Sequence, residues 1–234
     1  MGVTHHLALW SPDLPRRLRE ETTRSPGQPI RAPTIGDNCV RCPVGTATYP
    51  VRVLPQGYEI RPLGEGDAAS LASAYERNRE HLAPWDPRRE ESFFTQRGQR
   101  EDIEAKLVAA HHGLVVPWLV MHGTDVVGRV NLNNIVRGVF QNASVGYWVD
   151  HAHTGRGLAT AAVDFAVERA EALGLHRLEA GTLAHNVASQ RVLARSGFEQ
   201  YGEAKDYLFI AGSWQDHRLF QRILHDRPAG NPVP

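Results

Sequence analysis

Cysteine is scarce in this chain of 234 residues, and its scarcity excludes a fold built around disulfide bonds. Cys39 and Cys42 are the only two cysteines, whereas small secreted folds that depend on disulfides carry several pairs. A structural zinc site needs four ligands, and no second Cys-x-x-Cys pair is present. The histidines show no His-Glu-x-x-His spacing. We therefore predict no bound metal.

Neither sign of charge is in excess. Lys and Arg together number 26, and so do Asp and Glu, which gives a formal net charge of zero. Proteins that bind nucleic acids or membrane surfaces usually carry a strong basic excess. No uninterrupted apolar stretch approaches the roughly 20 residues that span a bilayer, and no hydrophobic leader with a cleavage site opens the sequence. We expect a cytoplasmic globular protein that binds neither nucleic acid nor membrane directly.

Sustained apolar periodicity is absent from the first 48 residues, which mix charges, prolines and glycines. Such composition is typical of a poorly ordered extension. Regular patterning begins near Tyr49 and continues almost to the end of the chain. We therefore predict an extension over residues 1–48, a single α/β domain over residues 49–227 and a flexible tail over residues 228–234.

Hydrophobic periodicity predicts alternating strands and helices within the domain. "YEIRPL" alternates like a strand. The helix after it carries one stripe of residues at helical spacing, formed by Leu71, Ala74, Tyr75, Asn78 and Leu82. A second helix is expected near residues 97–111, and "PWLVMHGTDVVGRVNLNNI" predicts a hairpin around a Gly-Thr-Asp turn. With a long helix over residues 158–173, the predicted order is β-α-α-β-β-β-α-β-α-β-β.

Residues 154–160, "TGRGLAT", place two glycines and an arginine where a predicted strand ends and a helix begins. The segment is either a plain tight turn or an anion site at a helix start. Neither the dinucleotide fingerprint nor a P-loop is present. A second strand-to-helix turn, "HNVASQ", follows about thirty residues later. If the two strands are neighbours, both turns open at the same sheet edge, where ligands of α/β sheets collect.

Two long segments, "VGYWVDHAHTGRGLATAAVDFAVERA" and "LHRLEAGTLAHNVASQRVLARSGF", resemble the GNAT acetyltransferases. The resemblance is to the RimJ/RimL branch, covers about residues 49–225, and includes "GYEIRPLGEGDA", "ERNREHLAPW" and "SWQDH". It implies the GNAT α/β fold, with a mixed central sheet of about six to seven strands flanked by helices. It also implies acetyl-CoA as co-substrate and, as acceptor, a protein N-terminal amine, with Ala or Ser first and a ribosomal protein as the partner.

The resemblance assigns the coenzyme pyrophosphate to one loop, formed by Thr154, Gly155, Arg156, Gly157, Leu158 and Ala159. The family carries Gln or Arg at the first of these positions, where this chain has Thr154. The missing side chain would have donated a charge-assisted hydrogen bond worth roughly 1.5–3 kcal/mol. We therefore expect acetyl-CoA to bind about 10–100-fold more weakly than that bond would allow, with Arg156 or His153 as a replacement donor.

The pantetheine arm is assigned by the same resemblance to the strand that carries Tyr147, Trp148 and Val149. In the family this strand separates from its neighbour, and its backbone N–H groups can hold the thioester oxygen. The side chains themselves are expected in the core. Asn186 either contacts the coenzyme arm or is an ordinary N-cap of its helix.

Ser189 and Glu179 are the candidate catalytic residues. Ser189 follows Asn186 by one helical turn and could hydrogen-bond the departing thiolate, or it is simply a serine at a helix start. The tyrosine that protonates the thiol in many other GNAT enzymes would fall at Leu193. Glu179 is either the base, acting through a water, or an outward-facing carboxylate in a salt bridge.

Trp85, Asn131 and Asn133 are the candidate acceptor-binding residues. The two asparagines share one face of "RVNLNN" and could orient a peptide, whereas Trp85 either lines the acceptor groove or covers the core. Two other functions stay open: acetylation of a small-molecule amine, such as an antibiotic or a polyamine, and non-catalytic binding of an acyl-CoA. The chain is expected to be a monomer or a homodimer.

Overall fold

The computed structural model describes residues 51–228. The expectations for residues 1–48, for Cys39 and Cys42, and for most of the tail lie outside the described residues. The strands in residues 51–228 are β1 (Arg52–Val53), β2 (Tyr58–Pro62), β3 (Val116–His122), β4 (Asp125–Val136), β5 (Asn142–Val149), β6 (Arg177–Leu183), β7 (Glu199–Ile210) and β8 (Ser213–Ile223). The α-helices are α1 (Ala68–Arg77), α2 (Arg79–Leu82), α3 (Gln96–His111), α4 (Leu158–Ala172) and α5 (Val187–Arg195), and the 3-10 turns used below are η4 (Glu91–Phe94) and η5 (His151–His153).

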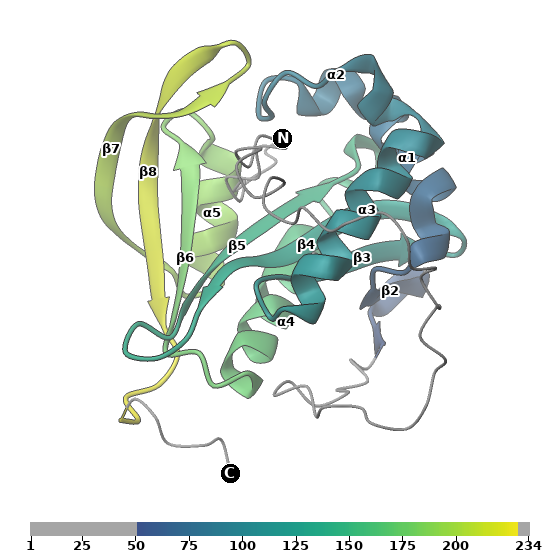
Figure 1. Ribbon diagram of the computed structural model, residues 1–234. Helices are drawn as coiled ribbons and strands as arrows, with labels where there is room; N and C mark the ends of the chain where they lie inside the picture. The colour runs from purple at the N-terminus through teal and green to yellow at the C-terminus, as the bar shows by residue number, and fades with distance from the viewer. Residues whose placement is uncertain (1–50, 229–234) are drawn as a thin grey trace, which may run out of the picture. The chain divides into compact units, whose positions relative to one another are not determined.

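The eight strands form one sheet in the order β1-β2-β3-β4-β5-β6-β8-β7 (Figure 1). Neighbours are antiparallel except β5 and β6, which are parallel. The predicted α/β class and order of elements are confirmed, with β1 and α2 added. The prediction of six to seven strands was one short, because β1 has only two residues, Arg52 and Val53, paired with Ile60 and Glu59. Two residues carry no periodic pattern that a sequence could reveal.

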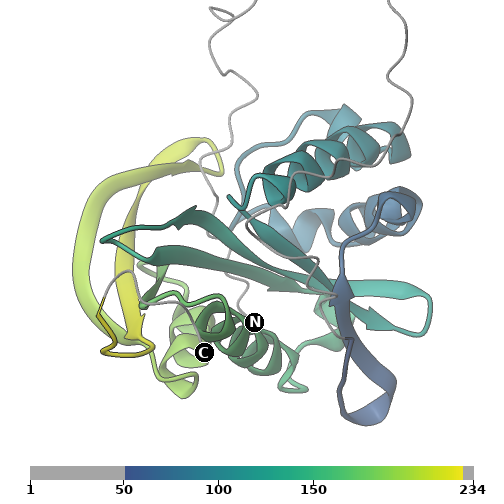
Figure 2. The same cartoon turned by 60° about the horizontal axis from the view of Figure 1, so that its bottom comes forward.

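Helices cover both faces of the sheet (Figures 1 and 2). α4 and α5 lie on one face, called here the α4 face, and α1, α2 and α3 lie on the other, the α1 face. β3 shows how a strand serves both layers. Trp118 and Val120 belong to the core on the α4 face, while Leu119 and Met121 belong to the core on the α1 face. Because both faces are covered, β3 is a nearly continuous apolar run.

The helices follow the sequence pattern closely. All five side chains of the stripe predicted between Leu71 and Leu82 are buried. The Thr95 side chain caps α3 by accepting a hydrogen bond of 3.1 Å from the backbone N–H of Gly98. Gly174 follows α4 with a φ of 72°, the left-handed conformation that glycine commonly adopts just after a helix end. No helix within residues 51–228 is long and apolar enough to cross a bilayer.

β5 and β6 separate after a short contact, and this separation opens the sheet. They pair only at residues 142–144 of β5 and 177–179 of β6. β5 then continues along β4, and β6 continues along β8. Residues 145–149 and 180–183 therefore border a wedge between the strands, and within residues 51–228 the two borders are not paired with each other.

Candidate active site

A cavity of about 270 Å³ lies at the wide end of the wedge, where β5 leads into α4. We call it the turn cavity. It is lined by Val149, His153, Thr154, Gly155, Gly157, Leu158, Ala159, Thr160, Ala188, Arg191, Val192 and Arg195. Most of the residues predicted to bind the coenzyme pyrophosphate are in this lining, and Asp and Glu are absent from it. The cavity therefore has no acidic side chain that would repel an anion.

The start of α4 has the geometry of an anion site. Gly157 is the N-cap with a φ of 78°, and Gly155 has a φ of 77°. Residues other than glycine adopt this left-handed backbone at a cost of about 1–2 kcal/mol. The first turn of this described helix has neither a side-chain cap nor an acidic residue. Its backbone N–H groups therefore lack helical acceptors and carry the positive end of the helix dipole.

Helix α5 contributes two arginines that the sequence reasoning missed. Arg191 and Arg195 lie four residues apart on one side of the helix, are exposed and line the turn cavity. Neither forms an ion pair with another residue of the described part of the chain. Their spacing in "SQRVLARSG" was the available signal. It shows that they share a side of the helix, but not that this side faces the wedge.

Tyr58 holds both of the residues proposed to replace the missing donor at Thr154. Arg156 Nη1 donates to the Tyr58 hydroxyl oxygen at 3.0 Å, and His153 Nδ1 lies 2.9 Å from the same oxygen. His153 lines the turn cavity, whereas Arg156 is not part of the lining. Burial lowers the pKa of His153. Thr154 itself donates its hydroxyl to the carbonyl of His151 at 2.9 Å.

A buried carboxylate anchors the turn to α1. Asp150 is 1% exposed and accepts hydrogen bonds from Arg77 Nε at 2.6 Å, Asn78 Nδ2 at 2.9 Å and the Ala152 backbone N–H at 2.9 Å. Burial alone would raise the pKa of Asp150, but the hydrogen bonds from Asn78, Ala152 and Arg77 outweigh it and lower that pKa. Asn78 Oδ1 also accepts from the His151 backbone N–H at 2.9 Å. Side-chain contacts of the protein itself thus fix the turn.

Polar side chains from three strands line up where the wedge begins. Asn133 of β4 pairs with Ser144 of β5, and Ser144 pairs with Glu179 of β6. Trp148, four residues after Ser144 on β5, belongs to the core on the α1 face, so the row faces the same way. Asn133 and Ser144 are buried. Glu179 is the carboxylate of this row.

The next row along the wedge has glycine on both borders. Gly146 of β5 pairs with Asn131 of β4, and Gly181 stands two residues beyond the last paired position of β6. These two glycines leave the wedge free of their own side chains on the α1 face. The side-chain oxygen of Asn131 accepts a hydrogen bond of 3.2 Å from Arg129 Nε. Its amide N–H₂ group therefore points away from Arg129.

Glu179 lies in a network of donors. Its Oε1 accepts from Arg177 Nη2 at 2.6 Å and from the Tyr201 hydroxyl at 3.3 Å, and its Oε2 accepts from Asn142 Nδ2 at 3.1 Å. Burial, together with the charge of Glu179, raises the pKa of Tyr201, so this hydroxyl remains a donor. Tyr201 lies at a bulge of β7 and was not identified from the sequence. The predicted salt bridge of Glu179 exists, but it is half-buried at the start of the wedge.

On the α4 face, Ser189 is fully buried and its Oγ lies 3.0 Å from the Tyr147 hydroxyl oxygen. Either oxygen can donate. The Ser189 backbone N–H donates to Asn186 Oδ1 at 3.2 Å, so Asn186 caps α5, one of the two roles expected for it. Leu193 is fully buried in the core of this face. Ser189 and Tyr147 therefore form a pair of hydroxyls between α5 and β5.

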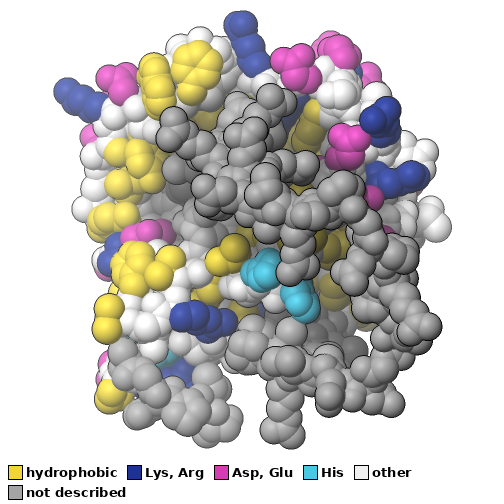
Figure 3. Space-filling view, in the orientation of Figure 1, with side chains coloured by type: hydrophobic (Ala, Val, Ile, Leu, Met, Phe, Trp, Pro, Cys, Tyr) yellow, Lys and Arg dark blue, Asp and Glu magenta, His cyan; other side chains and the backbone are white. Residues whose placement is uncertain are grey.

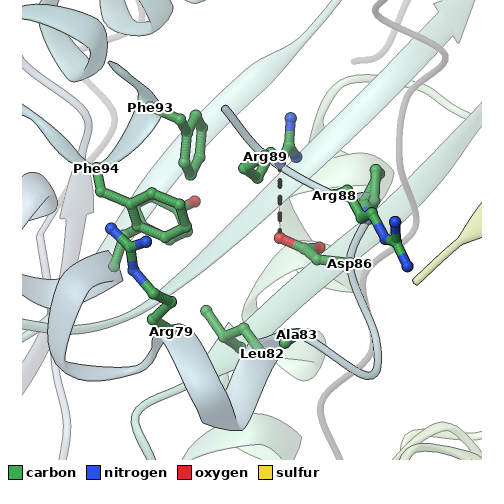
Figure 4. Close-up of a pocket in the computed structure, with 10 residues that line it drawn as sticks. Arg79, Leu82, Ala83, Asp86, Arg88, Arg89, Phe93 and Phe94 are labelled. Atoms are coloured by element: carbon green, nitrogen blue, oxygen red, sulfur yellow. Dashed lines mark ion pairs between the residues drawn. The ribbon is translucent and has the colours of Figure 1, made fainter. Parts of the chain in front are cut away.

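A second cavity, also of about 270 Å³, lies on the α1 face between α1, α2 and η4. We call it the helix cavity. It is lined by Tyr75, Arg79, Leu82, Ala83, Asp86, Pro87, Arg88, Arg89, Phe93 and Phe94. Figure 4 shows Phe93 and Phe94 on one side and Asp86 on the other. The Arg79 guanidinium lies 3.7 Å from the centre of the Phe94 ring, and that of Arg89 lies 4.6 Å from the Phe93 ring.

Trp85 is next to the helix cavity in sequence but is not part of its lining. Its half-buried ring packs against three apolar side chains, Leu183, Leu208 and Ile210. The ring centre also lies 5.5 Å from that of His185. The Ala211 backbone N–H donates to the Asp86 carbonyl at 3.1 Å. The loop after α2 therefore contacts the tip of the β7–β8 hairpin, and the two together bridge the wedge.

The outer side of this hairpin is aromatic. Phe209 and Trp214 are 52% and 61% exposed, and their ring centres are 5.7 Å apart. Apolar side chains gather on the side of the molecule where β7 and β8 lie (Figure 3). Leu208 and Ile210, which flank Phe209 along β7, are buried and pack against Trp85. The hairpin thus turns its aliphatic side chains toward the wedge and its aromatic ones outward.

Most of the residues predicted for the site border the wedge. The loop of residues 154–159, predicted to bind the coenzyme, lies at the wide end of the wedge. Glu179 lies at its narrow end on the α1 face, and Ser189 lies with Asn186 on the α4 face. The Trp148 side chain instead lies in the core, where its Nε1 donates to the Tyr75 hydroxyl at 3.2 Å. Within residues 51–228, no three His, Cys, Asp or Glu side chains are grouped closely enough to hold a metal ion.

The Acetyltransferase (GNAT) domain family matches residues 58–199 of the chain. That span contains the wedge and both cavities. The ribosomal protein uS5-alanine N-acetyltransferase of Escherichia coli (strain K12) is 34% identical over 176 residues, which cover 72% of this chain and 89% of that protein.

Solved structures agree with this match. The ribosomal-protein-S5-alanine acetyltransferase from Vibrio fischeri gives a TM-score of 0.73 at 35% identity, covering 76% of this chain and 99% of that one. Mycobacterium smegmatis RimJ in complex with CoA-disulfide gives a TM-score of 0.70 at 32% identity, covering 74% of this chain and 85% of that one. A similar protein has thus been solved with coenzyme A.

Proposed function

The chain belongs to the GNAT acetyltransferase family, in the RimJ/RimL branch, and from this membership we propose that it acetylates the N-terminal α-amine of a protein. Acetyl-CoA is the acetyl donor. The acceptor is an unfolded chain end that starts with alanine or serine, and a ribosomal protein is the expected source. Two relatives support this choice. The E. coli and V. fischeri proteins are named as alanine acetyltransferases of the ribosomal protein uS5 or S5.

The uncapped start of α4 beside a cavity without carboxylates is the observation that carries the proposal. Coenzyme A bears a pyrophosphate and a further phosphate, and helix starts bind such groups through backbone N–H and dipole. Arg191 and Arg195 add positive charge on the other side of the cavity. The amide groups of a pantetheine arm match the backbone N–H and C=O groups that β5 presents to the wedge beyond its last pair with β6. The turn cavity and the wedge together therefore suit the coenzyme.

Acetyl-CoA supplies an acyl group already activated as a thioester. An α-amine has a pKa of about 7.7–8.0, so part of the acceptor is neutral at pH 7 and can attack. Glu179, at the start of the wedge on the α1 face, takes the proton that the nitrogen loses, directly or through one water. Backbone N–H groups of β5 hold the negative charge that develops on the acyl oxygen.

The hydroxyl pair of Ser189 and Tyr147 on the α4 face protonates the leaving sulfur. As the carbon–sulfur bond breaks, the Ser189 hydroxyl donates its proton to the departing thiolate. The Tyr147 hydroxyl, 3.0 Å away, can resupply that proton to Ser189, and the cycle closes when Glu179 releases its proton to water and the hydroxyl pair takes one back from water. This assignment gives a role to a serine that is fully buried and lies one turn inside the helix that borders the wedge.

A thiol-release assay with acetyl-CoA tests the proposal. The panel contains peptides that begin with Ala, Ser or Met, the same peptides with a blocked N-terminus, and free amines such as spermidine. We expect release with the free Ala and Ser peptides and none with the blocked ones, and mass spectrometry should place the acetyl group on the α-amine. Turnover of spermidine but of no peptide would contradict the proposal.

Paired variants test the two catalytic assignments. Ser189→Ala and Glu179→Gln should each lower kcat by at least about tenfold, the scale of a lost acid or base, with little change in acetyl-CoA affinity. Ser70→Ala on α1 and Glu104→Gln on α3 are matched controls outside the wedge, and both should keep wild-type turnover. If the wedge variants match their controls, the assignment of these residues is wrong.

A further inference from the structure

The helix cavity is enclosed mainly by rings and aliphatic groups. Three aromatic side chains, Tyr75, Phe93 and Phe94, contribute to its lining, with Leu82, Ala83 and Pro87 as the aliphatic part. Its volume of about 270 Å³ equals that of about nine water molecules. It is smaller than the pockets of about 300–1,000 Å³ that hold whole small-molecule ligands. One large side chain is the kind of group that suits this size and lining.

Two of the three arginines of the lining, Arg79 and Arg89, are paired with carboxylates. Arg79 donates to Glu91 at 2.7 Å and to Glu76 at 2.8 Å while it covers the Phe94 ring. Arg89 lies over the Phe93 ring, and its Nε is 3.8 Å from the Asp86 carboxylate. These pairs neutralise most of the charge around the cavity. The walls therefore favour an apolar occupant over a phosphate or a carboxylate.

The helix cavity lies close to the point of attack. Tyr75 is part of its lining, and the Tyr75 hydroxyl accepts from Trp148 Nε1 at 3.2 Å. Trp148 follows Gly146 by two residues on the same face of β5, a distance of about 7 Å. Gly146 borders the wedge where an amine would reach the thioester. The Trp148 side chain therefore links this border of the wedge to Tyr75 in the cavity wall, so the side chains nearest the reacting amine are the ones that could reach the cavity.

We infer that the helix cavity receives the side chain of the second residue of the acceptor and selects a large apolar or aromatic group there. The inference rests on the proposed function, because it needs a peptide whose first nitrogen reacts in the wedge. Burying a Leu or Phe side chain contributes about 1.5–3 kcal/mol, which corresponds to a preference of about 10–100-fold over glycine.

A peptide series measures this preference. The peptides share alanine at position 1 and one uncharged tail, and carry Phe, Leu or Gly at position 2. We expect kcat/KM to be about 10–100-fold higher for Phe and Leu than for Gly. A second series moves Phe to position 1 or 3, where the preference should disappear. Equal kcat/KM for all residues at position 2, or a preference that follows Phe to another position, overturns the inference.

Ala83→Phe blocks the cavity without touching the core, because Ala83 is exposed and its side chain lines the cavity. This variant should reduce the Phe-to-Gly ratio of kcat/KM to about one. Ala69→Phe, at an exposed alanine of α1 outside the lining, is the matched control and should keep the full ratio. Phe94→Ala widens the cavity and should lower the preference for Phe.

The outcomes separate the two proposals. If no peptide is acetylated although acetyl-CoA binds, the proposed function fails, and the inference fails with it. If all peptides are acetylated with no dependence on position 2, the inference alone fails. A preference that Ala83→Phe leaves intact would show that another surface reads the second residue, which also overturns the inference.

Discussion

The two cavities have the same volume, about 270 Å³ each, but they are built in different ways. The turn cavity is made largely from backbone, with Gly155 and Gly157 in left-handed conformations and α4 starting at its wall. The helix cavity is made from side chains carried by α1, α2, the loop after α2 and η4. A site built from backbone suits a ligand that does not vary, such as the phosphate groups of coenzyme A. A site built from side chains can change its selectivity without altering the fold.

The largest expected effect comes from breaking the backbone side of this comparison. Gly157→Val puts a β-branched residue at a φ of 78°, where the left-handed strain of about 1–2 kcal/mol shifts the helix start and weakens its attraction for phosphate. We expect coenzyme A to bind about 100-fold more weakly by calorimetry. Gly138→Val is the control, since Gly138 has a φ of 73° and equally open surroundings but lies outside both cavities. Equal affinity in the two variants would refute the role of the turn.

A second prediction removes the anchor of the turn. Asp150→Asn should cost about 2 kcal/mol of unfolding free energy at pH 7, within the range for hydrogen bonds to a charged group. The lowered pKa of Asp150 means that its stabilisation is present above about pH 4, the ordinary carboxyl range, and is lost as pH falls below it. Denaturant unfolding should therefore show the variant and the wild type converging as pH falls below the ordinary carboxyl range.

The surface pair of Arg52 and Glu168 provides the contrast for that measurement. Glu168 is 46% exposed, so Glu168→Gln should change the unfolding free energy by no more than about 0.5 kcal/mol. If Asp150→Asn is as mild as this control, the turn does not depend on its buried carboxylate.

A third prediction concerns the side chains that the turn cavity does use. Arg191→Gln and Arg195→Gln should each weaken coenzyme A binding by about fivefold and flatten its salt dependence, because both arginines are exposed and screened. Calorimetry at two salt concentrations measures both effects. Arg100→Gln, at an exposed arginine of α3, is the control and should leave affinity and salt dependence unchanged. If a variant that combines both substitutions keeps the salt dependence of the wild type, the two arginines do not take part in coenzyme binding.

The smallest expected effect is a pH dependence that arises from His153. Burial lowers its pKa, with Arg156, His122 and Arg77 acting in the same direction and Asp150 opposing them. The ring is therefore neutral at pH 7.5 and gains charge only below its ordinary value of about 6.5. A cation there attracts phosphate, so coenzyme affinity relative to His153→Gln should rise, by up to about fivefold, as pH falls below that ordinary value. The ratio of the two proteins cancels the titration of the phosphate, and a ratio that is constant with pH would contradict this role.

The parts of the fold that follow periodicity were predictable from the sequence. The stripe of α1, the long apolar run of α4 and the glycine Gly174 after α4 each have a local cause, so the local sequence is enough to predict them. Gly155 and Gly157 were also visible, because a left-handed backbone selects glycine wherever it occurs. The choice between a plain turn and the proposed anion site needed the structure, because the sequence does not reveal that α4 starts without a side-chain cap.

The rest of the site depends on contacts between distant segments. The helix cavity gathers residues from four short elements that share no repeat, so no window of sequence contains its pattern. The network of Glu179 includes Tyr201, which a bulge in an edge strand brings within 3.3 Å. The direction in which Arg191 and Arg195 point depends on how α5 packs. These are tertiary outcomes that propensity and spacing do not encode.

The hydrogen bond from the Ala211 N–H to the Asp86 carbonyl has a topological consequence. With Trp85 packed beside it, this contact closes a ring of protein that runs from the loop after α2, across the hairpin tip and back through the sheet. An acceptor chain that passes through such a ring must enter by one of its ends. A free terminus of a chain can do so, whereas a lysine in the middle of a folded surface cannot.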